Sequence, residues 1–160
     1  MDLTKILRTS ASGMHVQGER MRIVAENLAN AGASANSPGD ESYRRKLITF
    51  SNELYRELGV PLVSVDRVTL DQSQFGRIYD PGHPGAIDQG YVLMPNVNAL
   101  IEMTDMRDAQ RGYEANLSII RVAKGMLKRT HMRDLAHIAV GIRKILTELY
   151  ASSPITFPPS

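Results

Sequence analysis

The stretch that decides the fold is LTKILRTSASGMHVQGERMRIVAENLANAG, residues 3–32. Its apolar and small residues recur at alternating spacings of four and three, the heptad spacing of a coiled-coil seam. This pattern predicts one helix over 3–32, ended by Gly32 and the turn sequence NSPGD. Because several seam positions hold Ala or Gly, the helix buries little area and should need partners. The seam consists of Leu7, Ala11, Met14, Gly18, Met21, Ala25 and Leu28.

A second heptad pattern predicts a helix from about Asn98 to Thr130. Asn96 or Asn98 can cap its start, because an Asn side chain accepts hydrogen bonds from the free N–H groups there. Gln110 within the seam either fixes the register or faces solvent. Two such helices around a short middle predict an antiparallel, coiled-coil-like pair that holds most of the buried surface. The second seam consists of Ala99, Met103, Met106, Gln110, Tyr113, Leu117, Ile120, Lys124 and Leu127.

The segment between the helices has a different composition. It is rich in Val, Ile, Leu and Thr with partial alternation, and Pro and Gly residues divide it into short pieces. So short a segment buries little surface by itself. The fold class is therefore predicted to be mainly α with a small β-rich insert. Strands are expected at 44–50, 62–70, 76–80 and 90–94.

The C-terminal residues form a further segment. Its apolar residues are spaced as in an amphipathic helix, and the last ten residues have the composition of a disordered end. It fits a natural extension, a frame-shifted end or a fused segment. We therefore expect a helical assembly domain made of 1–34 and 96–130, an insert over 35–95, and an extension over 131–160.

Composition excludes several classes of protein. The chain of 160 residues has no Cys, so disulfides, thiolate metal sites and cysteine nucleophiles are excluded. Its 19 basic and 17 acidic residues are dispersed, whereas a nucleic-acid binder clusters its basic residues. No window approaches 18 apolar residues, so no span of a membrane is expected. The N-terminal residues lack the apolar core of a signal peptide, so any export should use a route without a cleaved signal.

The stretch IYDPGHPGAIDQGYVLMPNVN, residues 78–98, holds the best candidate for catalysis. His83 lies between Asp80 and Asp88, which suggests acid–base or metal chemistry. However, there is no second His nearby, and no nucleophile-elbow motif is present. Prolines on both sides of His83 fix the backbone there instead. We therefore predict a rigid connector and no catalytic, cofactor-binding or metal-binding residue.

Two smaller motifs allow more than one interpretation. The basic run RRK, residues 44–46, could touch phosphate, but a solvated strand edge is the expected reading. Asn27 and Asn30 lie near the end of the first predicted helix. They either mark a helix that is losing propensity or donate hydrogen bonds to neighbouring chains in a bundle, and the residues alone leave both readings open.

The two helical stretches resemble the terminal signatures of the flagellar axial proteins, the rod and hook family. The N-terminal stretch SASGMHVQGERMRIVAENLANAG resembles that family's small-residue and Gly-Met start, followed by A-x-N-x-A-N. The stretch NVNALIEMTDMRDAQRGYEANLSIIRVAKGML is similar to its C-terminal helix. The matching residues are Gly13, Met14, Gln17, Arg20, Met21, Ala25, Asn27, Leu28, Ala29 and Asn30, then Asn96, Val97, Glu102, Met103, Met106, Gln110, Arg111, Tyr113, Glu114, Ala115, Asn116 and Met126.

The resemblance is strongest to the short, proximal-rod members of the family, through residues 79–98. It implies a non-enzymatic subunit of the basal-body rod in the periplasm, which polymerises through its terminal helices into a hollow, torque-transmitting tube. The implied partners are copies of itself, rod subunits of the FlgB, FlgF, FlgG and FliE types, and the flagellar export apparatus. Nucleic acid and direct membrane insertion are not implied. A coiled-coil adaptor for one helical partner, or an enzyme using His83, are the alternatives.

Overall fold

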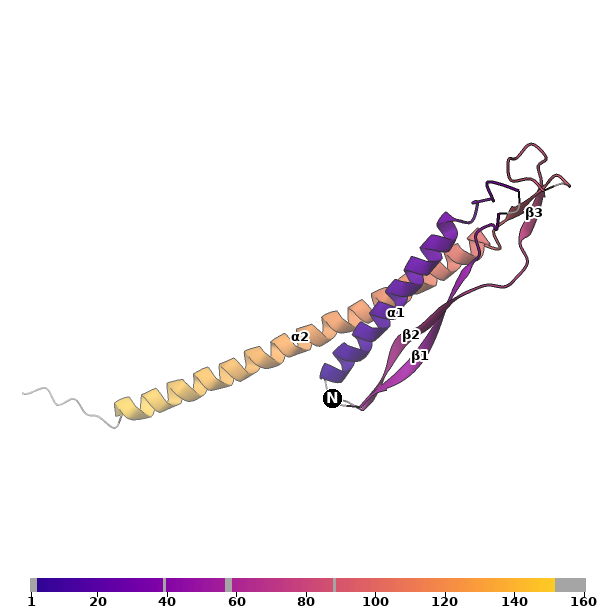
Figure 1. Ribbon diagram of the computed structural model, residues 1–160. Coiled ribbons are helices and arrows are strands. Elements are labelled where there is room, and N and C mark those ends of the chain that lie inside the picture. The colour runs from indigo at the N-terminus through magenta and orange to yellow at the C-terminus, as the bar shows by residue number, and fades with distance from the viewer. Residues whose placement is uncertain (1–2, 39, 57–58, 88, 152–160) are drawn as a thin grey trace, which may run out of the picture. The chain divides into compact units, whose positions relative to one another are not determined.

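The structure, a computed structural model, describes residues 3–38, 40–56, 59–87 and 89–151. Along the chain come α1 (Leu3–Ala29), β1 (Lys46–Tyr55), β2 (Val60–Leu70), β3 (Gly76–Tyr79), β4 (Tyr91–Met94) and α2 (Ala99–Ala151) (Figure 1). The fold is thus mainly helical with small β elements, as predicted. The chain forms two compact units, Met1–Ile120 and Arg121–Ser160, and α2 passes from the first into the second.

Helix α1 ends at Ala29, rather than at Gly32 as predicted. At this end the carbonyl oxygen of Glu26 accepts a 2.8 Å hydrogen bond from Nδ2 of Asn30 and a 3.2 Å bond from its backbone N–H. This carbonyl is one of the last in the helix, where acceptors lack an intrahelical donor. The turn that follows starts at Asn30.

Helix α2 begins with Asn98 as its cap. The Oδ1 of Asn98 accepts hydrogen bonds from the backbone N–H groups of Leu100 and Ile101, at 3.0 and 3.3 Å. The predicted end near Thr130 is wrong, since α2 continues to Ala151. Residues 99–151 contain no proline, so no proline interrupts this helix. The predicted disordered end falls largely on 152–160, which lie outside the described residues.

The four predicted strands are confirmed, and they form two separate antiparallel hairpins. In the first, β1 pairs with β2 from Lys46↔Leu70 to Tyr55↔Val60, so β1 is longer than predicted. The register shifts between Thr49 and Phe50, where one extra residue of β2 makes a bulge. In the second, β3 pairs with β4 from Gly76↔Met94 to Tyr79↔Tyr91.

Within the first unit, α1 packs against the β1–β2 hairpin, which runs beside it in Figure 1. The buried apolar side chains of α1 are those of Val16, Ile23 and Val24. Val92 of β4 and Ala109 of α2 are also buried. This core is small, so polar contacts take a large share in holding the elements together.

Helix α1 and the first part of α2 run antiparallel, as the contacts between them show. A side-chain carbon added at Gly13 would lie 2.8 Å from Asn116, and one added at Gly112 would lie 3.0 Å from Gln17. Such close approach needs glycine on one side of each contact. These contacts use residues outside the predicted seams, so the predicted coiled-coil packing of the seams stays a prediction.

Candidate functional site

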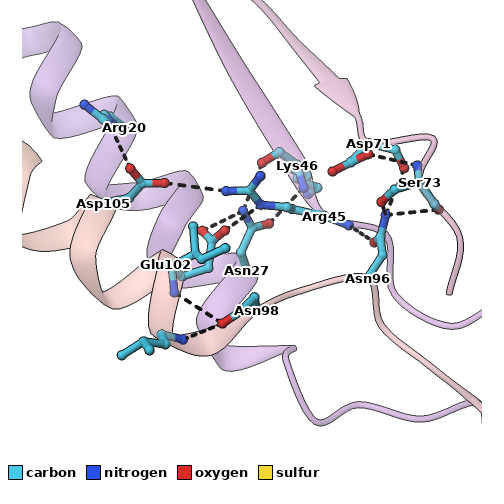
Figure 2. A network of polar contacts seen from close by, with 12 residues as sticks. Arg20, Asn27, Arg45, Lys46, Asp71, Ser73, Asn96, Asn98, Glu102 and Asp105 are labelled. Atoms are coloured by element: carbon cyan, nitrogen blue, oxygen red, sulfur yellow. Dashed lines mark hydrogen bonds and ion pairs between the residues drawn. The ribbon is translucent and has the colours of Figure 1, made fainter. Parts of the chain in front are cut away.

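A network of polar side chains joins α1, the start of β1 and the start of α2 (Figure 2). We call the side chains of Arg20, Asn27, Arg45, Lys46, Glu102 and Asp105 the polar network. At its centre Asn27 is 1% exposed and Glu102 is fully buried. Buried polar groups are costly unless they are hydrogen-bonded, so the partners of these two side chains decide what the network does.

Asn27 uses its full hydrogen-bonding capacity. Its Nδ2 donates to the backbone oxygen of Lys46 at 2.9 Å and to Oε2 of Glu102 at 3.1 Å. Its Oδ1 accepts from the backbone N–H of Lys46 and from the hydroxyl of Tyr43, both at 2.9 Å. The amide therefore pairs with the backbone of Lys46 on both its donor and acceptor sides, which fixes the strand against the helix.

Glu102 and Asp105 receive the cations of the network. Nε of Arg45 donates to Oε1 of Glu102 at 2.5 Å, and its NH2 group lies 3.5 Å from Oδ2 of Asp105. The NH2 group of Arg20 donates to Oδ1 of Asp105 at 2.8 Å. The guanidinium of Arg45 thus compensates the buried charge of Glu102. Removal of one partner from such a buried pair is strongly destabilising, because the other charge stays buried and unpaired.

Asn96 extends the network to the end of the first hairpin. Its Oδ1 accepts from the backbone N–H of Arg45 at 2.8 Å, and its Nδ2 donates to the backbone oxygen of Asp71 at 3.1 Å and to Oγ of Ser73 at 2.9 Å. The backbone N–H of Ser73 in turn donates to the Asp71 carboxylate, which lowers the pKa of that carboxyl group. Asn96 therefore ties both ends of the hairpin together rather than capping α2.

Tyr43 covers the network on the side of the loop before β1. Burial raises the pKa of its hydroxyl, and the nearby carboxylates of Glu26 and Glu102 raise it further. The hydroxyl is therefore held in its neutral form, which can donate to Asn27. Nζ of Lys46 pairs with the carboxylate of Glu26 on the same side.

The prediction that the basic run at 44–46 is a solvated strand edge is wrong. Arg44 stacks over the ring of Phe75, with its guanidinium carbon 4.2 Å from the ring centroid. Arg45 and Lys46 are half-buried and are paired with carboxylates on α2 and α1. The acidic partners lie far away in the sequence, so only the folded chain reveals them.

The chain itself covers the predicted seam residues only in part. None of them is buried, whereas the buried residues of α1 lie at other helical positions. A side-chain carbon added at Gly18 would find no atom within 4 Å. Ala11, Ala25, Met103, Gln110, Lys124 and Leu127 are exposed, and Leu7, Met14, Gly18, Met21, Leu28, Ala99, Met106, Tyr113, Leu117 and Ile120 are half-buried.

The family-motif residues divide into an inner and an outer group. Asn27 and Asn96 belong to the contacts described above, and the Asn116 side chain lies against Gly13, with its Nδ2 donating to the backbone oxygen of Gly112. Gln17 also lies in the helix contact, where its Oε1 is buried without a hydrogen-bond partner among the described residues. Outside this group, Asn30 is half-buried, and Arg111 and Glu114 are exposed.

His83 fastens the turn between β3 and β4 to the segment after α1. The backbone N–H of Gly85 donates to Nδ1 of His83 at 3.0 Å, so Nδ1 carries no proton. Nε2 therefore holds the proton of the neutral ring and can donate to Oγ of Ser34, 3.1 Å away. A side-chain carbon at Gly85 would lie 2.0 Å from the backbone oxygen of Ala35, so the two segments are in close backbone contact.

Two other kinds of feature have no candidate among the described residues. No group of three or more His, Asp or Glu side chains among 3–38, 40–56, 59–87 and 89–151 is placed to hold a metal ion. Neither helix, over its described residues, has the length and apolar character that a membrane crossing requires.

The partners inside the polar network were not predicted from the sequence. Arg20 and Glu102 were identified only as residues that match the family pattern. Asp105 carries no local signal, because its partners Arg20 and Arg45 lie far away in the chain. The contacts of Asp71 and Ser73 with Asn96 also join distant residues. The one usable signal was charge: Arg45 and Lys46 begin an apolar strand, where unpaired cations are costly.

Comparison with known proteins gives a consistent result. Residues 88–131 match the family model described as the flagellar basal body rod FlgEFG protein C-terminal region. The flagellar basal-body rod protein FlgC of Agrobacterium fabrum is 46% identical over 128 residues, covering 80% of this chain and 92% of that protein. FlgC of Bacillus subtilis is 37% identical over 138 residues (77% and 92%), and FlgC of Salmonella typhimurium is 34% identical over 130 (81% and 96%). The chain therefore belongs to the FlgC family of flagellar basal-body rod proteins.

Proposed function

We propose that this chain builds the proximal rod by helical polymerisation, through the seam faces that its own fold covers only in part. The terminal helices, residues 1–34 and 96–130, form the assembly domain in this proposal. The insert over 35–95 braces them, and 131–160 is an extension. The product is a hollow rod that transmits torque and passes export substrates.

The observation that carries the proposal is the position of the seams. Apolar heptad positions are expected to be buried, yet Met103 is 48% exposed and Ala25 is exposed. The contacts between α1 and α2 are made instead by small and polar residues at other positions, such as Gly13 with Asn116. Each helix therefore keeps accessible surface at some seam positions, which another subunit can cover.

The polar network supports this proposal because it fixes how the two helices are rotated. Asn27 and Glu102 can satisfy their hydrogen bonds in one register only, since each bonds atoms on two other elements. Buried polar groups that fix register are a known device in helical assemblies. With the rotation fixed, the exposed seam positions keep one orientation, and subunit contacts that do not close on themselves generate a filament.

The remaining parts of the proposal follow from membership in a structural rod family. The chain performs no catalysis, and His83 acts as a fastener between backbone segments. It leaves the cell interior through the flagellar export apparatus without a cleaved signal peptide and assembles in the periplasm. Its partners are its own copies and rod subunits of the FlgB, FlgF, FlgG and FliE types.

The absence of cysteine allows a direct test by crosslinking. A chain with the double substitution Ala25→Cys and Gln110→Cys places one thiol on each seam, at exposed positions. In cells that lack the wild-type chain, a short thiol-reactive crosslinker should link these chains into covalent oligomers within isolated basal bodies. The same chain held as monomers in an export-deficient strain is the matched control and should give none.

The outcomes separate the alternatives. Oligomers in basal bodies alone support polymerisation through the seams. Functional basal bodies without any crosslink would mean that the seams are not subunit contacts. A single crosslinked species with one other protein, with no ladder, would favour the adaptor function instead.

A further inference from the structure

The part of α2 within the second unit has an exposed apolar face of its own. Its large side chains are those of Met132, Leu135, Ile138, Ile142 and Ile145, which are between 48% and 59% exposed. Spacings of three and four residues place them on one side of the helix. The arc they cover is wider than the narrow seam of a two-stranded coiled coil, because Met132 and Ile145 lie well apart around the axis.

The same segment has a large excess of positive charge, so the basic residues are not dispersed along the chain as expected from the sequence. Residues 121–147 contain a single acidic residue, Asp134. None of the ion pairs between described residues lies in this segment, whereas the cations of the polar network are paired. Its positive charge is therefore available to a partner. The cations are Arg121, Lys124, Lys128, Arg129, Arg133, Arg143 and Lys144.

A shallow hollow connects the charge with the apolar face. It has a volume of about 470 Å³ and is lined by Lys128, Arg129, Met132, Arg133 and Ala136. The aliphatic stems of Lys and Arg side chains can cover apolar surface while their charged ends stay in water. A matching ligand would combine an apolar body with an anionic head.

These features favour one occupant. A second copy of the segment would bring two strongly positive helices together, and like charges at close range repel. An amphipathic helix with basic residues and a wide apolar face is typical of binding to a membrane surface. We propose that residues 121–147 bind along the surface of an anionic lipid membrane, with the Leu135–Ile142 face toward the acyl chains.

This binding differs from a membrane crossing, because the helix lies parallel to the surface. Apolar burial and electrostatic attraction to anionic head groups both contribute. Each Lys or Arg close to an anionic surface strengthens binding roughly fivefold. The proposal concerns the second unit alone. It shares residues 121–130 with the end of the second seam, and its test changes no seam residue.

The test measures sedimentation of the full chain with lipid vesicles. Vesicles of phosphatidylglycerol and phosphatidylcholine should bind it, those of phosphatidylcholine alone should bind far less, and added salt should weaken the binding. Lys128→Gln with Arg143→Gln should weaken binding roughly 25-fold, because both cations border the apolar face. Ile138→Gln with Ile142→Gln should weaken it at least tenfold, on the order of the loss of two apolar side chains.

Matched controls lie on α2 in the first unit. Leu100 is 74% exposed and Arg107 is exposed, so Leu100→Gln and Arg107→Gln remove the same kinds of group elsewhere and should leave binding unchanged. Circular dichroism should show that all variants keep their helix content. Equal binding to both vesicle types would overturn the proposal. So would variants at 128 and 143, or at 138 and 142, that bind like the controls. Lipid-free oligomers that the Ile138 and Ile142 substitutions dissociate would also overturn it, since the face would then join two copies.

Discussion

The substitution Asn27→Asp tests the polar network with almost no change in shape. It replaces the Nδ2 donor by an oxygen, so the hydrogen bonds to the Lys46 backbone oxygen (2.9 Å) and to Glu102 (3.1 Å) become contacts between acceptors. It also adds a negative charge beside Glu102, which is fully buried. The bonds that Oδ1 accepts from Lys46 and Tyr43 can remain, so the change is confined to one side of the residue.

The expected loss of stability follows from those contacts. A buried acceptor left without a donor costs roughly 1–3 kcal/mol, and an uncompensated buried charge costs roughly 3–5 kcal/mol. These costs overlap, because Glu102 is counted in both, so we expect a loss of about 4 kcal/mol at neutral pH. Two carboxyl groups side by side raise the pKa of one of them, so part of the loss should be recovered in mild acid.

The assay is urea denaturation followed by circular dichroism, with Asn30→Asp as the matched control. Asn30 is half-buried and donates to a single helix carbonyl, that of Glu26, so its loss should cost about 1 kcal/mol. A difference between the two variants of less than about 1 kcal/mol would refute the reasoning, because it would mean that Asn27 and Glu102 are not a buried, coupled pair.

Three further predictions concern the contacts around the network. Gly85→Ala should destabilise the chain by about 3 kcal/mol in urea denaturation, since its side-chain carbon would lie 2.0 Å from the Ala35 oxygen, whereas Gly32→Ala, with no atom within 4 Å, should not. The pKa of Tyr43 is raised from 10.0, so its contribution to stability is complete below pH 10.0 and is lost as pH rises through the folded-state pKa. The unfolding free energy of the unmodified chain should therefore fall with pH in this alkaline range, and that of Tyr43→Phe should lack this fall. His83→Ala should cost about 1 kcal/mol and leave motility nearly intact, and loss of motility in a folded, exported variant would contradict the fastening role.

How much the sequence could predict depends on the range of the interaction. Heptad spacing and turn residues act locally, so both helices and all four strands could be predicted, and Asn98 could be named as a possible cap. The end of α2 could not, because the heptad pattern stops near Thr130 although no local residue ends the helix there. The rotation of the helices was also out of reach, since it depends on Arg45, Glu102 and Asp105 meeting across long stretches of chain.

The apolar pattern identified one face of each helix, but it did not indicate which part of the chain or which other subunit packs against that face. The predicted seam residues Met14 and Gly18 are half-buried and outside the helix contact, which uses Gly13 and Gln17. Glycine and polar residues contribute little to a hydrophobic pattern, so a contact built from them is invisible to it. This is the physical reason why the intramolecular contact escaped prediction.

The most direct test of assembly through the seams is Gly18→Leu compared with Gly18→Ala. In the single chain a side-chain carbon at this position meets no atom within 4 Å, so both variants should fold and be secreted at the normal level. In the rod, Leu should overpack against a neighbouring subunit, at a cost of roughly 1–3 kcal/mol for each copy, while Ala should be mild. Motility is measured together with the amount of secreted protein. The account predicts a secreted but non-motile Gly18→Leu strain and a motile Gly18→Ala strain; a fully motile Gly18→Leu strain would contradict it.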